Sequence, residues 1–320
     1  MTRIGWYGLG SMGLAMATNL QKHLATKSAL NLIYSNRTMA RGDALKALGA
    51  TPENSFSKLV SQCGIIFTMN PETNAKNKVS NDAVLQELIT SAIESGHSLR
   101  DKIFVDCSTV HPETVSRTVA KLKEQQACFL AAPVFGGNPI AVDGKLVFAI
   151  AGPKKASEVV KPLIQDVMGR KVIGCGEDAT KSSLLKIAGN IVTVNMMEAV
   201  GEAQVFAERT GLGTGPMEEL IGEAFGAVAG GYSKRLTTGA YAPPLDCRPG
   251  FGVSLAIKDA NHAFAMAKEH GVELPGLKVA HENMMAAREY AGECLDSSSM
   301  YGVLRQKAGM AFWNEKSRKK

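Results

Sequence analysis

The sequence lacks the features that mark several classes of protein. No uninterrupted apolar run reaches the roughly 20 residues of a membrane-spanning helix, so we expect no membrane segment. The six cysteines form no CxxC pair and have no histidine at metal-ligand spacing, which predicts reduced, mostly buried thiols and no metal site. The sequence also has no internal repeat and no low-complexity segment. These absences leave an ordinary globular protein.

Excess charge is also scarce. The formal net charge is +6, but four of those positive charges lie in the last five residues, 316–320. An excess this small and this local does not argue for nucleic acid as a partner. The first predicted strand begins at Arg3 and leaves no room for a signal or transit peptide. We therefore expect a cytoplasmic protein that acts on a small molecule.

What the sequence does contain is an alternation of strands and helices. The 320 residues exceed the size at which one core usually stops growing, so two domains are expected. Apolar runs predict strands at Arg3–Tyr7, Asn31–Ser35, Gly64–Met69, Lys102–Asp106, Cys128–Leu130, Leu146–Ala151 and Lys171–Ile173. Helical patterns lie between these strands. One covers about Met39–Leu48, and two others begin at Pro112 and at Lys154. The alternation predicts an α/β Rossmann domain over residues 1–176, with one doubly wound, mostly parallel sheet that the last three strands extend.

From Ala179 the pattern changes to long helical stretches. A first helix is predicted to continue to about Arg209, and thirty residues of helix would span about 45 Å. Glycine-rich breaks at Gly226–Gly231 and Gly239–Gly250 are typical of loops. We expect an all-α second domain over residues 177–320 that begins with this long interdomain helix.

The first predicted strand runs into a glycine motif that opens a helix. In Gly8-x-Gly10-x-x-Gly13, the first glycine permits a tight turn, the second lets a pyrophosphate approach the backbone, and the third allows the helix to pack on the strand. A glycine-rich turn can be purely structural, but this one lies between a strand and a helix. The motif predicts a dinucleotide site made by Gly8, Leu9, Gly10, Ser11, Met12 and Gly13.

The end of the second strand indicates which dinucleotide is bound. An NAD enzyme usually has Asp or Glu there to hold the ribose 2′-hydroxyl, whereas this chain has Asn36, Arg37 and Thr38, followed by Arg41. A guanidinium can pair with a 2′-phosphate and stack beside adenine. The sequence therefore favours NADP, and the alternative is that Arg37 and Arg41 are ordinary surface cations.

Taken together, the motifs resemble the β-hydroxyacid dehydrogenase family, which includes 3-hydroxyisobutyrate dehydrogenases and glyoxylate or succinic semialdehyde reductases. The resemblance spans nearly the whole chain. It rests on Gly8 to Gly13, Asp106-Cys107-Ser108-Thr109, Ala132-Pro133-Val134-Phe135-Gly136-Gly137, Lys186 with Asn190, and Lys258-Asp259. It implies an NADP-dependent oxidoreductase that transfers hydride between nicotinamide and a β-hydroxyacid or the corresponding aldehyde or semialdehyde.

The resemblance also implies roles for single residues. Lys186 is the expected acid/base, and Asn190, four residues later on the same helix face, orients the substrate oxygen. Without the resemblance, Lys186 would be read as an exposed helix lysine. Ser108, Gly136, Gly137 and Lys258 are expected to bind substrate, and Ser108 has the alternative role of a helix cap. Residues expected to complete the cofactor site are Met69, Asn70, Ser108, Phe251 and Lys258.

Two departures put the substrate in doubt. The family commonly has an aspartate where Ala131 stands and a serine where Phe135 stands. Phe135 adds apolar bulk, which favours a larger or less polar substrate, and Phe251, Tyr232 and Tyr241 are candidates for an apolar wall. The rival functions are imine reduction, whose enzymes usually lack the lysine, and NADP binding without catalysis. By resemblance we expect a homodimer or homotetramer.

Overall fold

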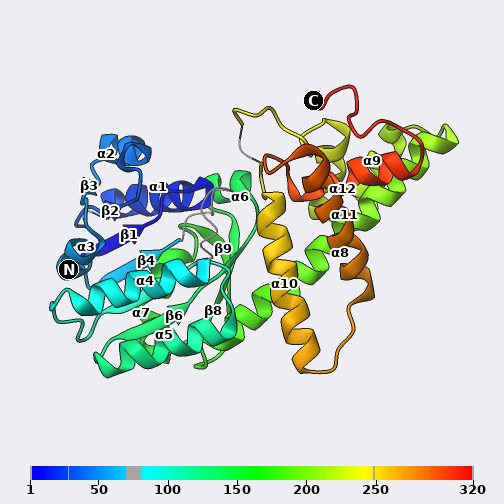
Figure 1. The fold of residues 1–320 in the computed structure, drawn as a ribbon. Helices are drawn as coiled ribbons and strands as arrows, with labels where there is room; N and C mark the ends of the chain where they lie inside the picture. Colours follow the sequence, from blue (N-terminus) through cyan, green and yellow to red (C-terminus); the bar gives the residue numbers. More distant parts are fainter. Residues whose placement is uncertain (1, 28, 70–80, 248, 319–320) are drawn as a thin grey trace. The chain divides into compact units, whose positions relative to one another are not determined.

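The computed structural model describes residues 2–27, 29–69, 81–247 and 249–318, and the chain divides into two compact units (Figure 1). The first unit ends at Lys186 and the second begins at Ile187. This division falls inside one long helix, α8 (Thr180–Thr210). The domain boundary expected between residues 176 and 177 stays a prediction.

The first unit contains a six-stranded sheet in the order β3-β2-β1-β4-β5-β6, with every neighbouring pair parallel. The strands are β1 (Ile4–Tyr7), β2 (Ile33–Ser35), β3 (Thr51–Pro52), β4 (Ile65–Thr68), β5 (Ile103–Asp106) and β6 (Cys128–Ala131). Strand order reverses between β1 and β4, which is where open α/β sheets bind ligands. The predicted Rossmann architecture is confirmed.

Helices cover both faces of this sheet, because alternate strand residues feed two separate apolar clusters. Trp6 and Phe67 pack with helix α1 on one face, while Ile66 and Phe104 pack with α4 and α5 on the other. The helical elements of the unit are α1 (Ser11–Thr26), η1 (Met39–Gly42), α2 (Asp43–Ala47), α3 (Phe56–Gln62), α4 (Asn81–Glu94), α5 (Pro112–Glu124), α6 (Asn138–Val142) and α7 (Lys154–Ile164).

Three further strands form a sheet of their own. The prediction that the strands at Leu146–Ala151 and Lys171–Ile173 extend the main sheet was therefore wrong, whereas the predicted strand at Cys128–Leu130 does extend it, as β6. The strands of this second sheet are β7 (Val134–Phe135), β8 (Leu146–Ile150) and β9 (Gly169–Gly174). Strand β7 is antiparallel to β8, and β8 is parallel to β9. The chain leaves β6 through Ala132 and Pro133, and the Pro133 carbonyl accepts from Ala149 N at 3.0 Å. Proline has no N–H for a further ladder bond, and the turn there starts β7 along β8.

The second unit is helical, and no strand is found among its described residues. Besides the later part of α8, it contains α9 (Thr214–Thr237), α10 (Val253–Glu269), α11 (Pro275–Ala291), η2 (Ser297–Ser299) and α12 (Met300–Lys307). The loop expected at Gly226–Gly231 is instead a kink within α9, where only Gly226 leaves helical geometry, with φ at +82°. Nothing in the described part of the chain is both long enough and apolar enough to be a membrane-crossing helix.

All six cysteines are free thiols, as expected, but they are not mostly buried. Cys63 and Cys107 are buried, Cys128 and Cys175 are partly buried, and the remaining two, at positions 247 and 294, are exposed. Within the described ranges no three His, Cys, Asp or Glu side chains gather as a metal site would require.

Candidate functional site

The glycine turn between β1 and α1 separates glycines that the fold needs from one that it leaves open. Gly8 has φ at +96°, and a Cβ there would lie 1.9 Å from the carbonyl oxygen of Met69. A Cβ on Gly13 would lie 2.0 Å from the Gly8 oxygen. A Cβ on Gly10 would meet no protein atom within 4 Å. Gly8 and Gly13 are thus required for packing, whereas the space beside Gly10 is free for a ligand.

Helix α1 begins next to this space. Gly10 occupies its N-cap position, so no side chain caps the first turn, and Leu14 N is the donor to the Gly10 carbonyl at 3.0 Å. The backbone amides before Leu14 in the first turn have no acceptor within the helix. Such amides are the groups that bind phosphate at helix N-termini. The open space and these amides fit the pyrophosphate of a dinucleotide, which Gly10, Ser11 and Met12 would hold.

Asn36, at the end of β2, is directed inward. It is 7% exposed, its Oδ1 accepts from Leu9 N at 2.9 Å, and its Nδ2 donates to the Thr38 carbonyl at 2.7 Å. Both ends of the amide are therefore engaged in fixing the glycine turn. Arg37 and Thr38, which follow it, are exposed, and no carboxylate stands at this strand end. The exposed pair is what remains to contact an adenosine ribose.

A buried carboxylate lies at the end of β5. Asp106 Oδ1 accepts from Thr68 Oγ1 at 2.7 Å and from Ser108 Oγ at 2.9 Å. Burial raises the pKa of Asp106 to about 6, although these two hydrogen bonds act in the opposite direction. The hydrogen bond to Asp106 holds the Ser108 hydroxyl at the end of β5. The alternative role of Ser108 as a helix cap is wrong, since the N-cap of α5 is His111.

The segment that follows β7 is joined to the glycine turn. Gly136 has φ at +121°, and Gly137 is the N-cap of α6. Asn138 Nδ2 then donates to the Ser11 carbonyl at 2.7 Å, which links the predicted substrate glycines to the predicted cofactor turn. Sequence reasoning missed Asn138, because nothing in its local pattern shows a partner 127 residues away.

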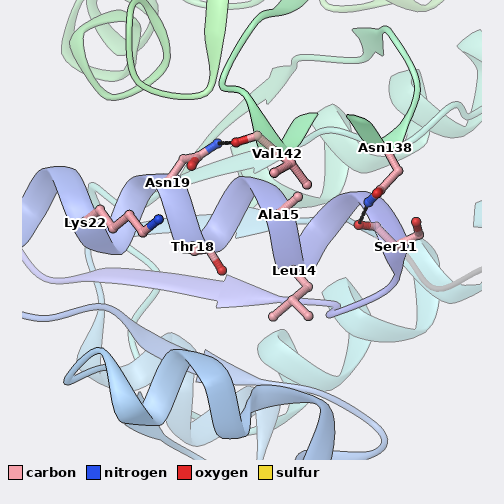
Figure 2. Close-up of a pocket in the computed structure, with 8 residues that line it drawn as sticks. All are labelled: Ser11, Leu14, Ala15, Thr18, Asn19, Lys22, Asn138 and Val142. Carbon is pink, nitrogen blue, oxygen red and sulfur yellow. Dashed lines mark hydrogen bonds between the residues drawn. The ribbon is translucent and has the colours of Figure 1, made fainter. Parts of the chain in front are cut away.

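A surface hollow of about 220 Å³ lies between α1 and α6. Figure 2 shows the residues that line it. Its lining residues are Ser11, Leu14, Ala15, Thr18, Asn19, Lys22, Asn138 and Val142. Asn19 Nδ2 donates to the carbonyls of Ala141 and Val142 at 2.8 and 3.2 Å and so fastens α6 to α1. Only Ser11 of this lining belongs to the predicted site, and we assign the hollow to helix packing.

The start of α8 is fixed on the first unit by Ser182. This fully buried residue has its Oγ 3.0 Å from the carbonyl oxygen of Ala131, at the end of β6. Lys186 lies one helical turn further along the same face. Its Nζ is 4.5 Å from the centroid of the Phe135 ring, so the predicted acid/base and the aromatic substitution are in contact.

In the second unit, Asp259 joins two predicted residues. Asn190 Nδ2 donates to Asp259 Oδ2 at 2.6 Å, and Lys258 Nζ lies 3.0 Å from Asp259 Oδ1. The carboxylate is 3% exposed, so this pairing is mostly screened from water. Sequence reasoning used Asp259 only as part of a motif. The position of Asp259 next to Lys258 in the sequence was the signal that could have indicated this pairing.

Three aromatic residues were candidates for an apolar wall. Tyr241 is fully buried, and its hydroxyl donates to the Phe312 carbonyl at 2.7 Å and accepts from Asn314 N at 2.8 Å. It is therefore a core residue of the helical unit. Tyr232 and Phe251 are partly buried beside the same core.

The predicted cofactor residue Met69 donates its amide to Tyr7 O at 2.9 Å, and Asn70 lies outside the described residues.

Comparison with known proteins identifies the family. Residues 3–176 match the model for the NAD binding domain of 6-phosphogluconate dehydrogenase. Residues 181–304 match the model described as NAD-binding of NADP-dependent 3-hydroxyisobutyrate dehydrogenase. The chain belongs to the β-hydroxyacid dehydrogenase family. Several matched relatives are named as hydroxyacid dehydrogenases, and the two matched models describe NAD(P)-binding domains.

The similarity to known relatives covers nearly the whole chain. An NADH-dependent oxidoreductase, ucdB, of Aspergillus ustus is 28% identical over 94% of this chain and 98% of its own. The mitochondrial 3-hydroxyisobutyrate dehydrogenase of Drosophila melanogaster is 28% identical over 95% and 89%.

Solved structures share the fold of this chain. The 3-hydroxyisobutyrate dehydrogenase of Mycobacterium tuberculosis, solved with L-serine, has a TM-score of 0.75 at 24% identity and covers 95% of this chain and 99% of its own. An imine reductase of Streptomyces aurantiacus has a TM-score of 0.58 at 19% identity, with coverage of 94% and 99%. The fold is therefore common to enzymes with different chemistry.

Proposed function

We propose that this dehydrogenase is an NADP-dependent enzyme that transfers hydride between nicotinamide and a β-hydroxyacid or the corresponding aldehyde or semialdehyde. The observation that carries the proposal is the position of Lys186, which Ser182 holds at the carboxyl end of β6, in the same unit as the open glycine turn. A proton carrier and a dinucleotide cradle in one unit are the two parts that this reaction needs.

The proposed preference for NADP rests on the end of β2. Asn36 is occupied by the glycine turn, and the exposed residues beside it are Arg37 and Thr38. A guanidinium binds a 2′-phosphate through charge-assisted hydrogen bonds, whereas a ribose diol is usually held by a carboxylate, which residues 36–38 do not supply. The similarity to an NADH-dependent oxidoreductase makes this preference a direct point for experiment.

The catalytic roles follow from the groups that can hold or move a proton. Bound NADPH supplies the hydride. In the direction of reduction, the Lys186 ammonium gives a proton to the substrate oxygen as the carbonyl carbon becomes a carbinol, and in oxidation the neutral amine takes that proton back. Asn190 is proposed to orient the same oxygen, with Asp259 fixing its amide. Ser108, Gly136, Gly137 and Lys258 are proposed to bind the rest of the substrate.

The substrate class is set by what surrounds Lys186. Phe135 presents an apolar ring to Lys186 where a hydroxyl is common in the family. We therefore expect aldehydes with an apolar substituent to be better substrates than glyoxylate.

We further propose that the enzyme is a cytoplasmic homodimer or homotetramer. Several large apolar side chains of α8 and α9 are more than half exposed: Val192, Phe206, Leu220, Phe225 and Val228. A second copy of the chain would cover them. Light scattering at micromolar concentration should give a mass of at least two chains, and the mass of one chain would end this part of the proposal.

The experiment that tests the function is NADPH oxidation against a panel of succinic semialdehyde, methylmalonate semialdehyde, glyoxylate and apolar aldehydes, with NADPH binding measured by fluorescence. Gly10→Val places a side chain in the open space, where its Cβ meets no protein atom within 4 Å, so it should abolish binding and turnover in a folded protein. Gly174→Val is the matched control, since its Cβ also enters open space in the same unit.

The outcomes separate the rival functions. Aldehyde-dependent NADPH oxidation that Gly10→Val removes and Gly174→Val retains would support the proposal. NADPH binding without turnover of any aldehyde would favour a cofactor-binding protein. Turnover that requires both a ketone and an amine would favour imine reduction.

A further inference from the structure

The strand β7 places Phe135 on the side opposite to the core. Its neighbour Val134 is 5% exposed and belongs to the apolar cluster of the first unit. Successive strand side chains point to opposite faces, so the Phe135 ring is turned away from that cluster and is partly exposed. The pairing of Phe135 with Val147 on β8 fixes the backbone from which the ring projects.

The helix α8 brings Lys186 to that ring. The Ser182 hydroxyl binds the Ala131 carbonyl at 3.0 Å, and the next turn of the helix carries Lys186 over Phe135, with 4.5 Å between Nζ and the ring centroid. This distance is well within the range of about 6 Å in which a cation and an aromatic face attract each other. Phe135 and Lys186 belong to the same compact unit.

We propose that Phe135 is a positioning residue for Lys186, which holds the ammonium group by a cation–π contact at a place where the family commonly has a serine. This inference rests on the proposed function, since it assigns how the acid/base of that reaction is held. The ring attracts the charged ammonium and not the neutral amine, so it favours the proton-loaded form that reduction of a carbonyl consumes. The Lys186 N–H bond breaks as the substrate O–H bond forms, and the substrate carbon receives the hydride.

The test varies the electrostatics of the ring at nearly constant shape. Phe135 is replaced by progressively fluorinated phenylalanines, which weaken the negative face of the ring, and by Tyr, Trp and Leu. With an aldehyde that the wild type reduces, kcat should fall stepwise with fluorination and by about 3- to 30-fold in Phe135→Leu, the range given by the strength of such contacts. Phe135→Tyr and Phe135→Trp should retain kcat, and the KM for NADPH should not change. A flat fluorination series, or Phe135→Leu equal to wild type, would overturn the proposal.

A second measurement needs no turnover. An amine-acylating reagent is applied at one fixed pH, and mass spectrometry gives the labelling rate of Lys186 relative to Lys181, an exposed lysine on the same helix. Only the neutral amine reacts, so labelling of Lys186 should rise by about 3- to 30-fold across the fluorinated series while Lys181 stays constant. If the wild type reduces no substrate but this rise is seen, the contact stands and the proposed reaction fails. Labelling that does not change along the series sinks the contact itself.

Discussion

The ends of β2 and β5 are both fixed by a buried polar side chain, but the chemical group differs. Each strand ends on a polar side chain that is turned inward and bonded to its neighbours: Asn36 to Leu9 N and the Thr38 carbonyl, and Asp106 to Thr68 and Ser108. The amide of Asn36 satisfies its partners without charge. The carboxyl of Asp106 must either lose its charge or remain charged in a buried place, and its raised pKa records that cost.

The difference shows that the direction of a side chain decides what a substitution in a motif means. Asn36 stands where an NAD enzyme has a carboxylate, yet its inward bonds make it part of the scaffold. Phe135 stands where a serine is common, and its outward ring meets Lys186. The first substitution changes how the glycine turn is held, and the second changes the surroundings of the proposed acid/base.

The largest effect on stability is expected from Asp106→Asn, which gives the end of β5 an amide side chain like that of Asn36 at the end of β2. The folded protein binds the Asp106 proton up to about pH 6, whereas an unfolded carboxyl releases it near pH 4. Stability from this group is therefore fully present below about pH 4 and is lost as the pH rises to about 6, a change of about 3 kcal/mol. Denaturant unfolding at a series of pH values should show that Asp106→Asn removes this decline.

The helical unit offers the control for that measurement. Burial raises the pKa of Glu198 to about 7, although its hydrogen bond from Asn283 acts in the opposite direction. Its loss of stability should therefore extend from about pH 4 to about pH 7, and Glu198→Gln should remove this share, including all of the decline above about pH 6 that Asp106→Asn leaves. If neither substitution alters the pH dependence of unfolding, the buried carboxyls are not its source.

The exposed neighbour of Asn36 should control cofactor choice. Arg37→Ala removes the charge proposed to bind the 2′-phosphate, so the KM for NADPH should rise by about 10- to 150-fold, the range for a hydrogen bond to a charged group. The KM for NADH should stay unchanged. Lys46→Ala, on the exposed side of α2, controls for general charge loss. An equal effect of Arg37→Ala on both cofactors would remove the assignment.

A somewhat smaller effect is expected from making both strand ends carboxyls. Asn36→Asp loses the bond to the Thr38 carbonyl and sets a carboxylate against that oxygen, so the protein should lose about 1–3 kcal/mol of stability at neutral pH. Because the side chain faces inward, the variant should gain no preference for NADH. A stable variant that prefers NADH would show that the side chain turns outward and that the comparison with Asp106 is wrong.

The smallest effect concerns the bond between the two glycine segments. Asn138→Ala removes the contact with the Ser11 carbonyl and should weaken NADPH binding about fivefold, as expected for one neutral hydrogen bond. Asn19→Ala loses its bonds to α6 but leaves Ser11 untouched, so it should affect stability and not binding. Titration calorimetry measures NADPH binding by the two variants. Equal losses of binding would show that the link between the segments is not specific.

Much of this architecture was predictable from local patterns. The apolar runs predicted β1, β2, β4, β5 and β6 to within two residues at each end, and the glycine spacing predicted the turn. The long helix was expected from Ala179 to about Arg209 and spans Thr180–Thr210. These elements depend on neighbours in the sequence, whose periodicity is visible without a structure.

The rest depends on partners far away in the chain. The separate sheet of β7, β8 and β9 follows from an antiparallel pairing of a two-residue strand, which leaves almost no periodic signal. The inward direction of Asn36 depends on an amide 27 residues earlier, and the contact of Phe135 with Lys186 depends on the anchoring of Ser182. No local pattern contains these contacts.

The central claim is that Lys186 moves the proton in the reaction, and a single-turnover measurement of NADPH oxidation with an accepted aldehyde tests it. Lys186→Ala should bind NADPH normally but slow this step by about 10²- to 10⁴-fold, the contribution of general acid catalysis, while Lys181→Ala retains the wild-type rate. A Lys186→Ala protein that matches the wild-type rate would contradict the account and leave only cofactor binding for this site.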